Sequence, residues 1–115
     1  MPRRDWSIRI QDILHAARKV IEHVKELDFD GFAADDWTVD AVLRNFTVIG
    51  EAARHVPDAI CQKYPNVPWQ DMRDMRNIVV HEYFRIDLTV VWNTIQEDLP
   101  ALIPRLEEVL KEEGE

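Results

Sequence analysis

Residues 69–84 read WQDMRDMRNIVVHEYF, a stretch without glycine or proline. Trp69, Met72, Met75 or Arg76, Val79 and Val80 recur at the three- and four-residue spacing that is typical of one face of a helix. We therefore predict a helix from Trp69 to about Phe84 that packs against other helices. Its second half also carries four polar residues of chemical interest, which are Arg76, Asn77, His81 and Tyr83.

Helical geometry sorts these four residues into two lines. Each residue advances about 100° round the axis, so Tyr83, seven residues after Arg76, returns nearly above it. Asn77 and His81 are four residues apart and stack on a second line, about 100–140° round from Arg76. The four side chains therefore fit in one broad polar arc, with Val80 between the two lines, and Val79 points toward the core.

The polar arc holds the groups that metal-free phosphodiester cleavage requires. Arginine offers a planar cationic fork for a phosphate, and histidine exchanges a proton near neutral pH. In this chemistry a base deprotonates a ribose 2′-hydroxyl, the oxygen attacks phosphorus, and a cation stabilises the phosphoryl oxygens. One His serves one proton-transfer role, so a symmetric homodimer would supply the second. The alternative is a solvated helix face with a structural His.

The remaining sequence predicts an all-α fold, a four- to five-helix up-and-down bundle. We expect helices over about 5–27, 36–56, 57–64, 69–84 and from 88 onward, with a loop at 28–35 and a kink or restart at Pro100. Asp36 or Thr38 can cap the second helix and Asp87 the last. Gly50 suggests a close helix crossing, with a tolerated accident as the alternative. The predicted buried positions are Trp6, Ile10, Ile13, Ala17, Val20, Val24 and Leu27, then Val39, Val42, Phe46, Ile49, Ala53 and Val56; Trp37, Trp69 and Trp92 are expected in the core or as helix staples.

Composition narrows the class of protein. A chain of 115 residues fits one domain, here 1–115, and its net charge of −8 argues against a large nucleic-acid footprint while suiting a basic protein partner. No apolar run is long enough to span a membrane, and the start does not resemble a signal peptide, so we expect a cytoplasmic protein. Cys61 is the single cysteine, and the His residues share no ligand spacing, so we expect no metal and no cofactor.

These residues resemble the HepT-like branch of the HEPN superfamily. The resemblance rests on Arg76-Asn77-x3-His81-x-Tyr83, on Pro68-Trp69 and Met75 before it, and on Asp87 and Val91-Trp92 after it. It extends to Asn45, to Ile49-Gly50-Glu51-Ala52-Ala53, to Tyr64-Pro65 and to Asp98-Leu99-Pro100, and so covers roughly residues 5–110.

The resemblance implies a homodimeric, metal-independent endoribonuclease that is the toxin of a toxin–antitoxin pair, with a composite site at the dimer interface. It implies a partner of the MNT type, a minimal nucleotidyltransferase that neutralises the toxin by transferring AMP to Tyr83. Arg76 would bind the scissile phosphate, His81 would transfer protons, and Asn77 would orient His81 or a phosphate oxygen. The added AMP would place a phosphodiester charge where Arg76 could bind it and so block the RNA site.

Two features of the sequence fit more than one interpretation. Glu51 on the second helix either holds Arg76 in position or is a surface carboxylate, and Glu82 points away from Tyr83. The alternative function is a non-catalytic helical adaptor, or a substrate-binding subunit, of a nucleotidyltransferase. The chain has no Gly-rich phosphate loop, so it is not expected to be the nucleotidyltransferase itself.

Overall fold

The computed structural model describes residues 3–114, and within this range it contains helices and no strand. Four helices are long: α1 (Arg3–Val24), α3 (Asp36–Arg54), α5 (Trp69–Glu82) and α7 (Leu99–Gly114). Between them lie α2 (Phe29–Ala34), α4 (Asp58–Lys63), the 3-10 turn η1 (Tyr83–Arg85), α6 (Leu88–Asn93) and the π-helical turn η2 (Thr94–Asp98). The predicted all-α bundle is confirmed.

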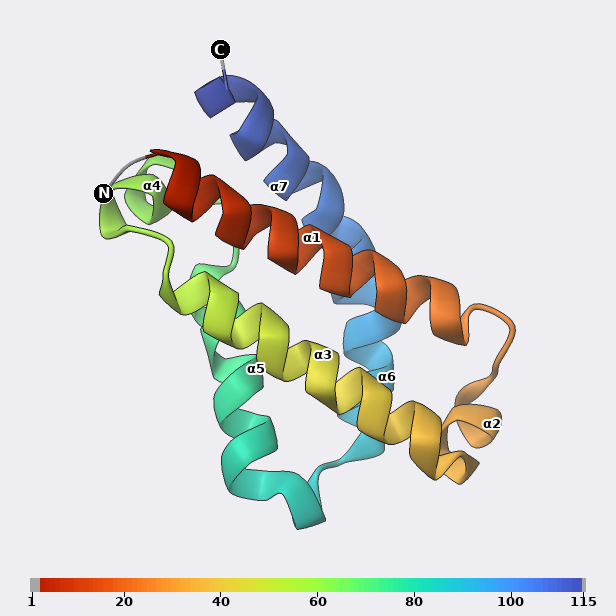
Figure 1. Ribbon diagram of the computed structural model, residues 1–115. Helices are drawn as coiled ribbons and strands as arrows, with labels where there is room; N and C mark the ends of the chain where they lie inside the picture. The colour runs from red at the N-terminus through yellow and green to blue at the C-terminus, as the bar shows by residue number, and fades with distance from the viewer. Residues whose placement is uncertain (1–2, 115) are drawn as a thin grey trace.

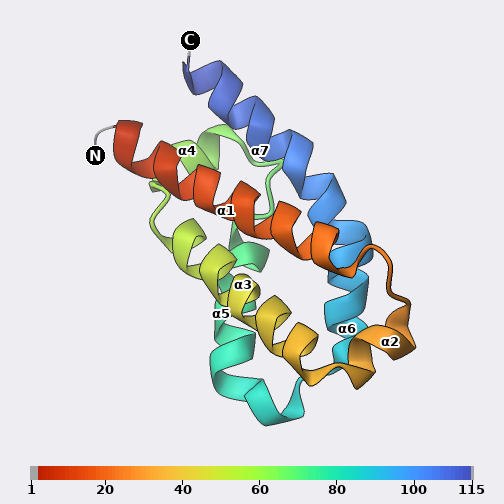
Figure 2. The same ribbon diagram turned by 45° about the vertical axis from the view of Figure 1, so that its right-hand side comes forward.

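The helix α3 occupies the middle of the bundle. Helix α1 runs alongside it in the opposite direction, and α5 packs on its other side (Figure 1). Helix α7 lies along the far side of α1, as the rotated view also shows (Figure 2). One hydrophobic core joins the long helices, so α3 is positioned by both α1 and α5.

The predicted apolar stripes form most of this core. The buried residues on the two predicted stripes are Trp6, Ile10, Ile13, Ala17, Val20, Val24, Val42, Phe46, Ile49, Ala53 and Val56. Val39 and Leu27 are only partly buried. The expectation for Trp37 is wrong, because this side chain is 87% exposed. Trp92 packs in part against the rings of Phe29 and Phe32.

The segment predicted as a loop at 28–35 contains the short helix α2. Its N-cap is Asp28, whose Oδ1 accepts a hydrogen bond from the Gly31 N–H at 2.8 Å. Phe32 on α2 is fully buried, and this apolar anchor explains why the segment is ordered as a helix.

Helix caps were predicted with mixed success. Asp35, rather than Asp36 or Thr38, caps α3: its Oδ1 accepts from the Thr38 N–H, and its Oδ2 accepts from the Thr38 hydroxyl at 2.9 Å. The neighbouring Asp gives the better geometry because it stands one residue outside the helix. Asp87 caps α6 as predicted, accepting from the Thr89 N–H at 2.9 Å.

Pro100 does not break the chain of helices. The Leu99 N–H bonds to the carbonyl of Thr94, five residues earlier, which is the wide turn of a π-helix. Pro100 then occupies the second position of α7, where a missing N–H costs little. The predicted restart therefore takes the form of a π-helical turn.

Gly50 marks the place where α3 and α5 come closest. A Cβ atom at this position would lie 2.4 Å from the Cβ of Arg76 and 2.7 Å from its backbone nitrogen. Real Cβ atoms do not approach a backbone this closely, so only glycine allows this crossing. The close crossing predicted from Gly50 is confirmed, and its partner on α5 is the first residue of the polar arc.

Gly50→Ala is expected to lower the free energy of unfolding by about 1–3 kcal/mol or more, because the added methyl group overpacks a contact made partly by backbone. The measurement is urea unfolding followed by helical circular dichroism. Gly31→Ala is the matched control, since its nearest neighbour is the movable Asp28 side chain at 3.2 Å. Equal stability of the two variants would contradict the close crossing.

Candidate active site

Arg76 is fixed by the α3–α5 crossing. Its Nε lies 3.1 Å from Oε1 of Glu51, the residue that follows Gly50 on α3, and its side chain is 31% exposed. Its Nη1 donates to Oδ1 of Asn77 at 3.3 Å. The predicted contact between Glu51 and Arg76 is therefore present. Two sides of the guanidinium are held, and Nη2 has no bond within residues 3–114, which leaves it available for a ligand.

Glu51 is itself held by a second arginine. Nη1 of Arg54 lies 2.8 Å from the same Oε1 atom. The hydrogen bond from Arg54, followed by the charges of Arg54 and Arg76, holds the pKa of Glu51 below its usual value. Glu51 is thus a carboxylate that orients Arg76. The role of Arg54 was missed, although its spacing of three residues from Glu51 on one helix could have suggested it.

His81 lies on the solvent side of α5. Its side chain is exposed, as are those of Asn77 and Val80. In the part of the chain that the structure describes, His81 makes no hydrogen bond or ion pair. An imidazole in this position is open to a substrate or to a second protein chain, and Asn77 lies four residues before it as predicted.

Tyr83 stands at the end of α5 rather than within it. The helix was predicted to continue to Phe84, but it ends at Glu82 and the chain tightens into the turn η1. The phenol of Tyr83 donates a hydrogen bond to Oδ1 of Asp40 on α3 at 2.7 Å. This bond, with the negative charge of Asp40, raises the pKa of Tyr83. Asp40 was missed because 43 residues separate it from Tyr83.

Arg76 from α5 and Tyr83 from η1 both reach α3, so the two side chains point to the same side of the molecule. Their partners Glu51 and Asp40 are 51 − 40 = 11 residues apart on α3, a helical rise of about 16 Å. The guanidinium and the phenol therefore contact two separate points of α3. A phosphate group on Tyr83 would not lie on Arg76 while the phenol oxygen stays at Asp40, contrary to the simple expectation from spacing.

Apolar side chains surround the exposed part of the polar arc. Phe84 is 97% exposed, and its ring contacts the ring of Tyr83 with centroids 5.1 Å apart. Ile78 and Val80 are also exposed. Neighbouring apolar residues of this kind on one helix and the turn that follows it suit contact with another protein surface.

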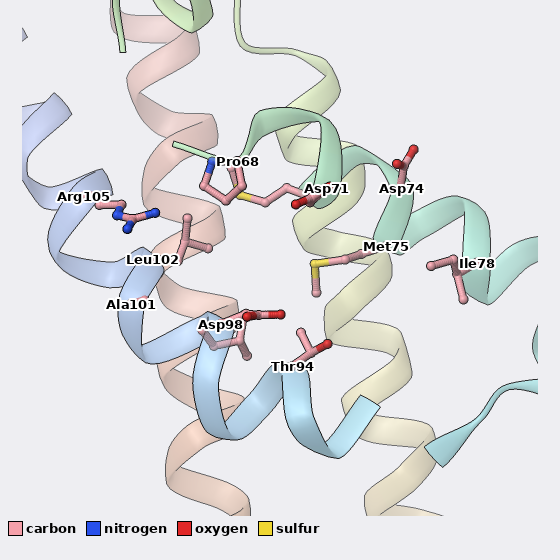
Figure 3. Close-up of a pocket in the computed structure, with 12 residues that line it drawn as sticks. Pro68, Asp71, Asp74, Met75, Ile78, Thr94, Asp98, Ala101, Leu102 and Arg105 are labelled. Atoms are coloured by element: carbon pink, nitrogen blue, oxygen red, sulfur yellow. The ribbon is translucent and has the colours of Figure 1, made fainter. Parts of the chain in front are cut away.

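A cavity lies on another side of α5. It has a volume of about 440 Å³ between α5, η2 and α7, and residues Asp71, Asp74, Asp98 and Arg105 supply its charged lining (Figure 3). None of the polar-arc residues lines it.

Over residues 3–114 no three His, Cys, Asp or Glu side chains are grouped to hold a metal ion. Within the same range, no helix has the length and apolar character to cross a membrane.

Comparison with known proteins now decides the family. The family model described as "Ribonuclease HepT-like" matches residues 13–109, a range that includes Glu51 and the whole polar arc. The chain belongs to this family. As a HepT-like protein, it is a member of the HEPN superfamily, as the sequence pattern predicted.

Relatives of the chain carry ribonuclease names. A candidate RNase of Methanocaldococcus jannaschii is 38% identical over 107 residues, covering 93% of this chain and 98% of the relative. The probable ribonuclease HepT of Thermococcus cleftensis is 35% identical over 109 residues, covering 95% and 99%. No solved structure gives a significant match. Family and relatives identify the chain as a ribonuclease, which favours the enzyme over the adaptor.

Asp40→Asn is expected to lower the pKa of Tyr83 toward the ordinary phenol value of about 10, because the carboxylate that stabilises the protonated phenol is removed. The hydrogen bond needs this proton, so its contribution to stability is present below pH 10 and is lost as the pH rises through the raised pKa. The measurement is absorbance titration of tyrosinate.

Tyr64 and Tyr83 are the two tyrosines of the chain, and Tyr64 provides an internal control. Its phenol donates to Glu113, which also raises its pKa, and Asp40→Asn should leave this titration unchanged. If the pKa of Tyr83 is unchanged in Asp40→Asn, the carboxylate of Asp40 does not stabilise the protonated phenol.

Proposed function

We propose that the chain is a metal-independent endoribonuclease whose composite site forms at a homodimer interface, with Arg76 and His81 as its catalytic residues. One observation carries the proposal. Arg76 is fixed by Glu51 and Asn77 with one donor edge unused, and His81 lies open to solvent on the same helix. A cation that is held in place and an accessible proton carrier are what metal-free phosphodiester cleavage requires.

Each residue then has a distinct part in the reaction. Arg76 binds the scissile phosphate through its free edge and stabilises the charge that develops on the phosphoryl oxygens. His81 takes the proton from the ribose 2′-hydroxyl, whose oxygen attacks phosphorus and expels the 5′-oxygen of the next nucleotide. That oxygen needs a proton, and His81 of a second copy of the chain donates it.

The surface next to His81 supports pairing of two copies. Ile78, Val80 and Phe84 expose apolar area on α5 and η1, and burying it in a symmetric contact would bring two α5 helices together. His81 shares this exposed side of the helix with Val80. A dimer built on this surface would therefore place both imidazoles in one cleft.

We further propose that the enzyme is the toxin of a toxin–antitoxin pair and that an MNT-type nucleotidyltransferase neutralises it at Tyr83. The phenol oxygen attacks the α-phosphorus of ATP, pyrophosphate leaves, and the phenol proton passes to Asp40, which already accepts it at 2.7 Å. The product oxygen has no hydrogen to donate, and its phosphodiester charge is repelled by Asp40. The modified side chain then turns outward into the cleft and blocks it.

Arg76→Ala and His81→Ala should each reduce RNA cleavage by about 10²-fold or more, because each removes a group that acts in the transition state. Cleavage by the unmodified chain should be the same with EDTA or with magnesium. The measurement is cleavage of RNA by protein that is free of AMP and of its partner. If that protein leaves RNA intact under both conditions, the adaptor interpretation gains and the nuclease proposal fails.

Controls and subunit mixing sharpen this result. His15→Ala and Arg105→Ala remove the same residue types from other helices, α1 and α7, and should retain activity.

When wild-type and His81→Ala chains are mixed as exchanging dimers, activity should fall as the square of the wild-type fraction, since each site needs two imidazoles. A linear fall would mean that each protomer holds a complete site.

Incubation with ATP and the neighbouring nucleotidyltransferase should add one adenylyl group at Tyr83, located by peptide mass spectrometry, and RNA cleavage should stop. Tyr83→Phe should stay unmodified and remain active in the presence of the partner. Tyr64 is the matched control, because its side chain is buried and bonded to Glu113. Modification at any other residue would contradict the neutralisation proposal.

A further inference from the structure

Two arginines next to the polar arc have no assigned role. Most lysine and arginine side chains that the structure describes make an ion pair or a hydrogen bond. Examples are the pairs Arg18 with Glu107 and Lys63 with Glu113. Arg9 on α1 and Arg44 on α3 make no ion pair or hydrogen bond within the described range. A single exposed arginine without an ion pair costs little free energy. These two arginines, however, line the same groove.

This α1–α3 groove is open and has a volume of about 410 Å³. Its lining consists of Arg9, Asp12, Arg44, Thr47, Val48, Glu51 and Ala52. The lining residues come from α1 and α3. These two helices run side by side, with α5 on the other side of α3 (Figures 1 and 2). Its rim residue Glu51 is the carboxylate that holds Arg76, so the groove begins where the catalytic arginine is fixed.

Register along α3 places Arg44 between the two contacts that α3 makes with the polar arc. Arg44 follows Asp40 by four residues and precedes Glu51 by seven, so all three lie on one outward line of the helix. Asp40 binds Tyr83 and Glu51 binds Arg76. Arg44 is thus the cation of α3 that stands closest to the midpoint of the site.

The local charge is opposite to that of the whole chain. Glu51 is neutralised by Arg54 and Arg76, and Asp12 is the other carboxylate in the groove lining. With Arg9 and Arg44 counted, and with Asp40 one turn before Arg44, four arginines stand against three carboxylates, a local balance of about +1 on a protein of net charge −8. A polyanion that approaches the acidic surface is attracted to this groove.

We propose that the α1–α3 groove binds the RNA backbone next to the scissile phosphate, with Arg44 and Arg9 contacting successive flanking phosphates. The proposal rests on the ribonuclease activity and extends the site from α5 across α3 to α1. Arginine is suited to this task because its planar fork pairs with phosphate oxygens, and contacts of this kind position a strand without reading its sequence.

The test is binding of a fluorescein-labelled single-stranded RNA of about 12 nucleotides, a length within the range that single-strand-binding folds cover. Binding is measured by anisotropy over a series of salt concentrations, in EDTA, with His81→Ala as the uncleaving parent. Arg44→Gln and Arg9→Gln should each weaken binding by about threefold to tenfold. Each should also reduce the salt slope by about 0.7, and the double variant by about twice that amount.

Matched variants separate a phosphate contact from a general change in charge. Arg105→Gln removes the same charge beside the cavity of Figure 3 and should leave affinity and slope near those of the parent. Arg44→Lys should retain most of the salt slope, and circular dichroism should show the same helix content for all variants. In the cleaving background, Arg44→Gln should raise KM more than it lowers kcat.

Several outcomes would contradict the proposal that the groove binds RNA. They are a parent that does not bind this RNA, groove variants that bind like the parent or like Arg105→Gln, and a polyglutamate peptide that binds as tightly as the RNA. The last would mark the groove as a site for an acidic protein segment. If wild-type protein fails to cleave RNA but the groove variants still lose affinity, the catalytic proposal fails and the groove stands.

Discussion

The approach of α3 to α5 at Gly50 and Arg76 determines where the rest of the site can lie. Because residue 50 has no side chain, the backbone of Arg76 lies directly against α3. The next residue of α3, Glu51, is then within 3.1 Å of the guanidinium, and Arg54 lies one turn further on the same helix. A packing constraint between two helices thus becomes a constraint on the orientation of Arg76, the proposed catalytic cation.

The same crossing fixes the two ends of the polar arc differently. From Arg76 onward α5 runs back along α3, so that Tyr83 arrives at Asp40 while Asn77 and His81 stay on the solvent side. Arg76 and Tyr83 are therefore held by contacts within the chain, whereas His81 is exposed and open to contact with a substrate or another chain. This division suits a site in which the protomer positions the phosphate and a second surface completes the proton transfer.

The sequence predicted the features that depend on local spacing. Apolar residues at helical intervals located the buried faces of α1 and α3, and Gly50 indicated a close crossing. Both features can be recognised in the sequence of a single helix. Features that depend on tertiary contact were missed. Asp40 meets Tyr83 across 43 residues, α2 is held by the buried Phe32, and Trp37 is exposed where a core position was expected.

The small number of arginines near the proposed site makes it sensitive to one added negative charge. The chain carries 22 acidic and 14 basic residues, so in the proposed site a bound polyanion would depend on a few arginines near α3 rather than on a broad basic surface. In a site of this kind one added charge is a large fraction of the local balance. On the proposed function, a single phosphodiester at Tyr83, turned outward from Asp40, is then sufficient to compete with the substrate phosphates for the same cations.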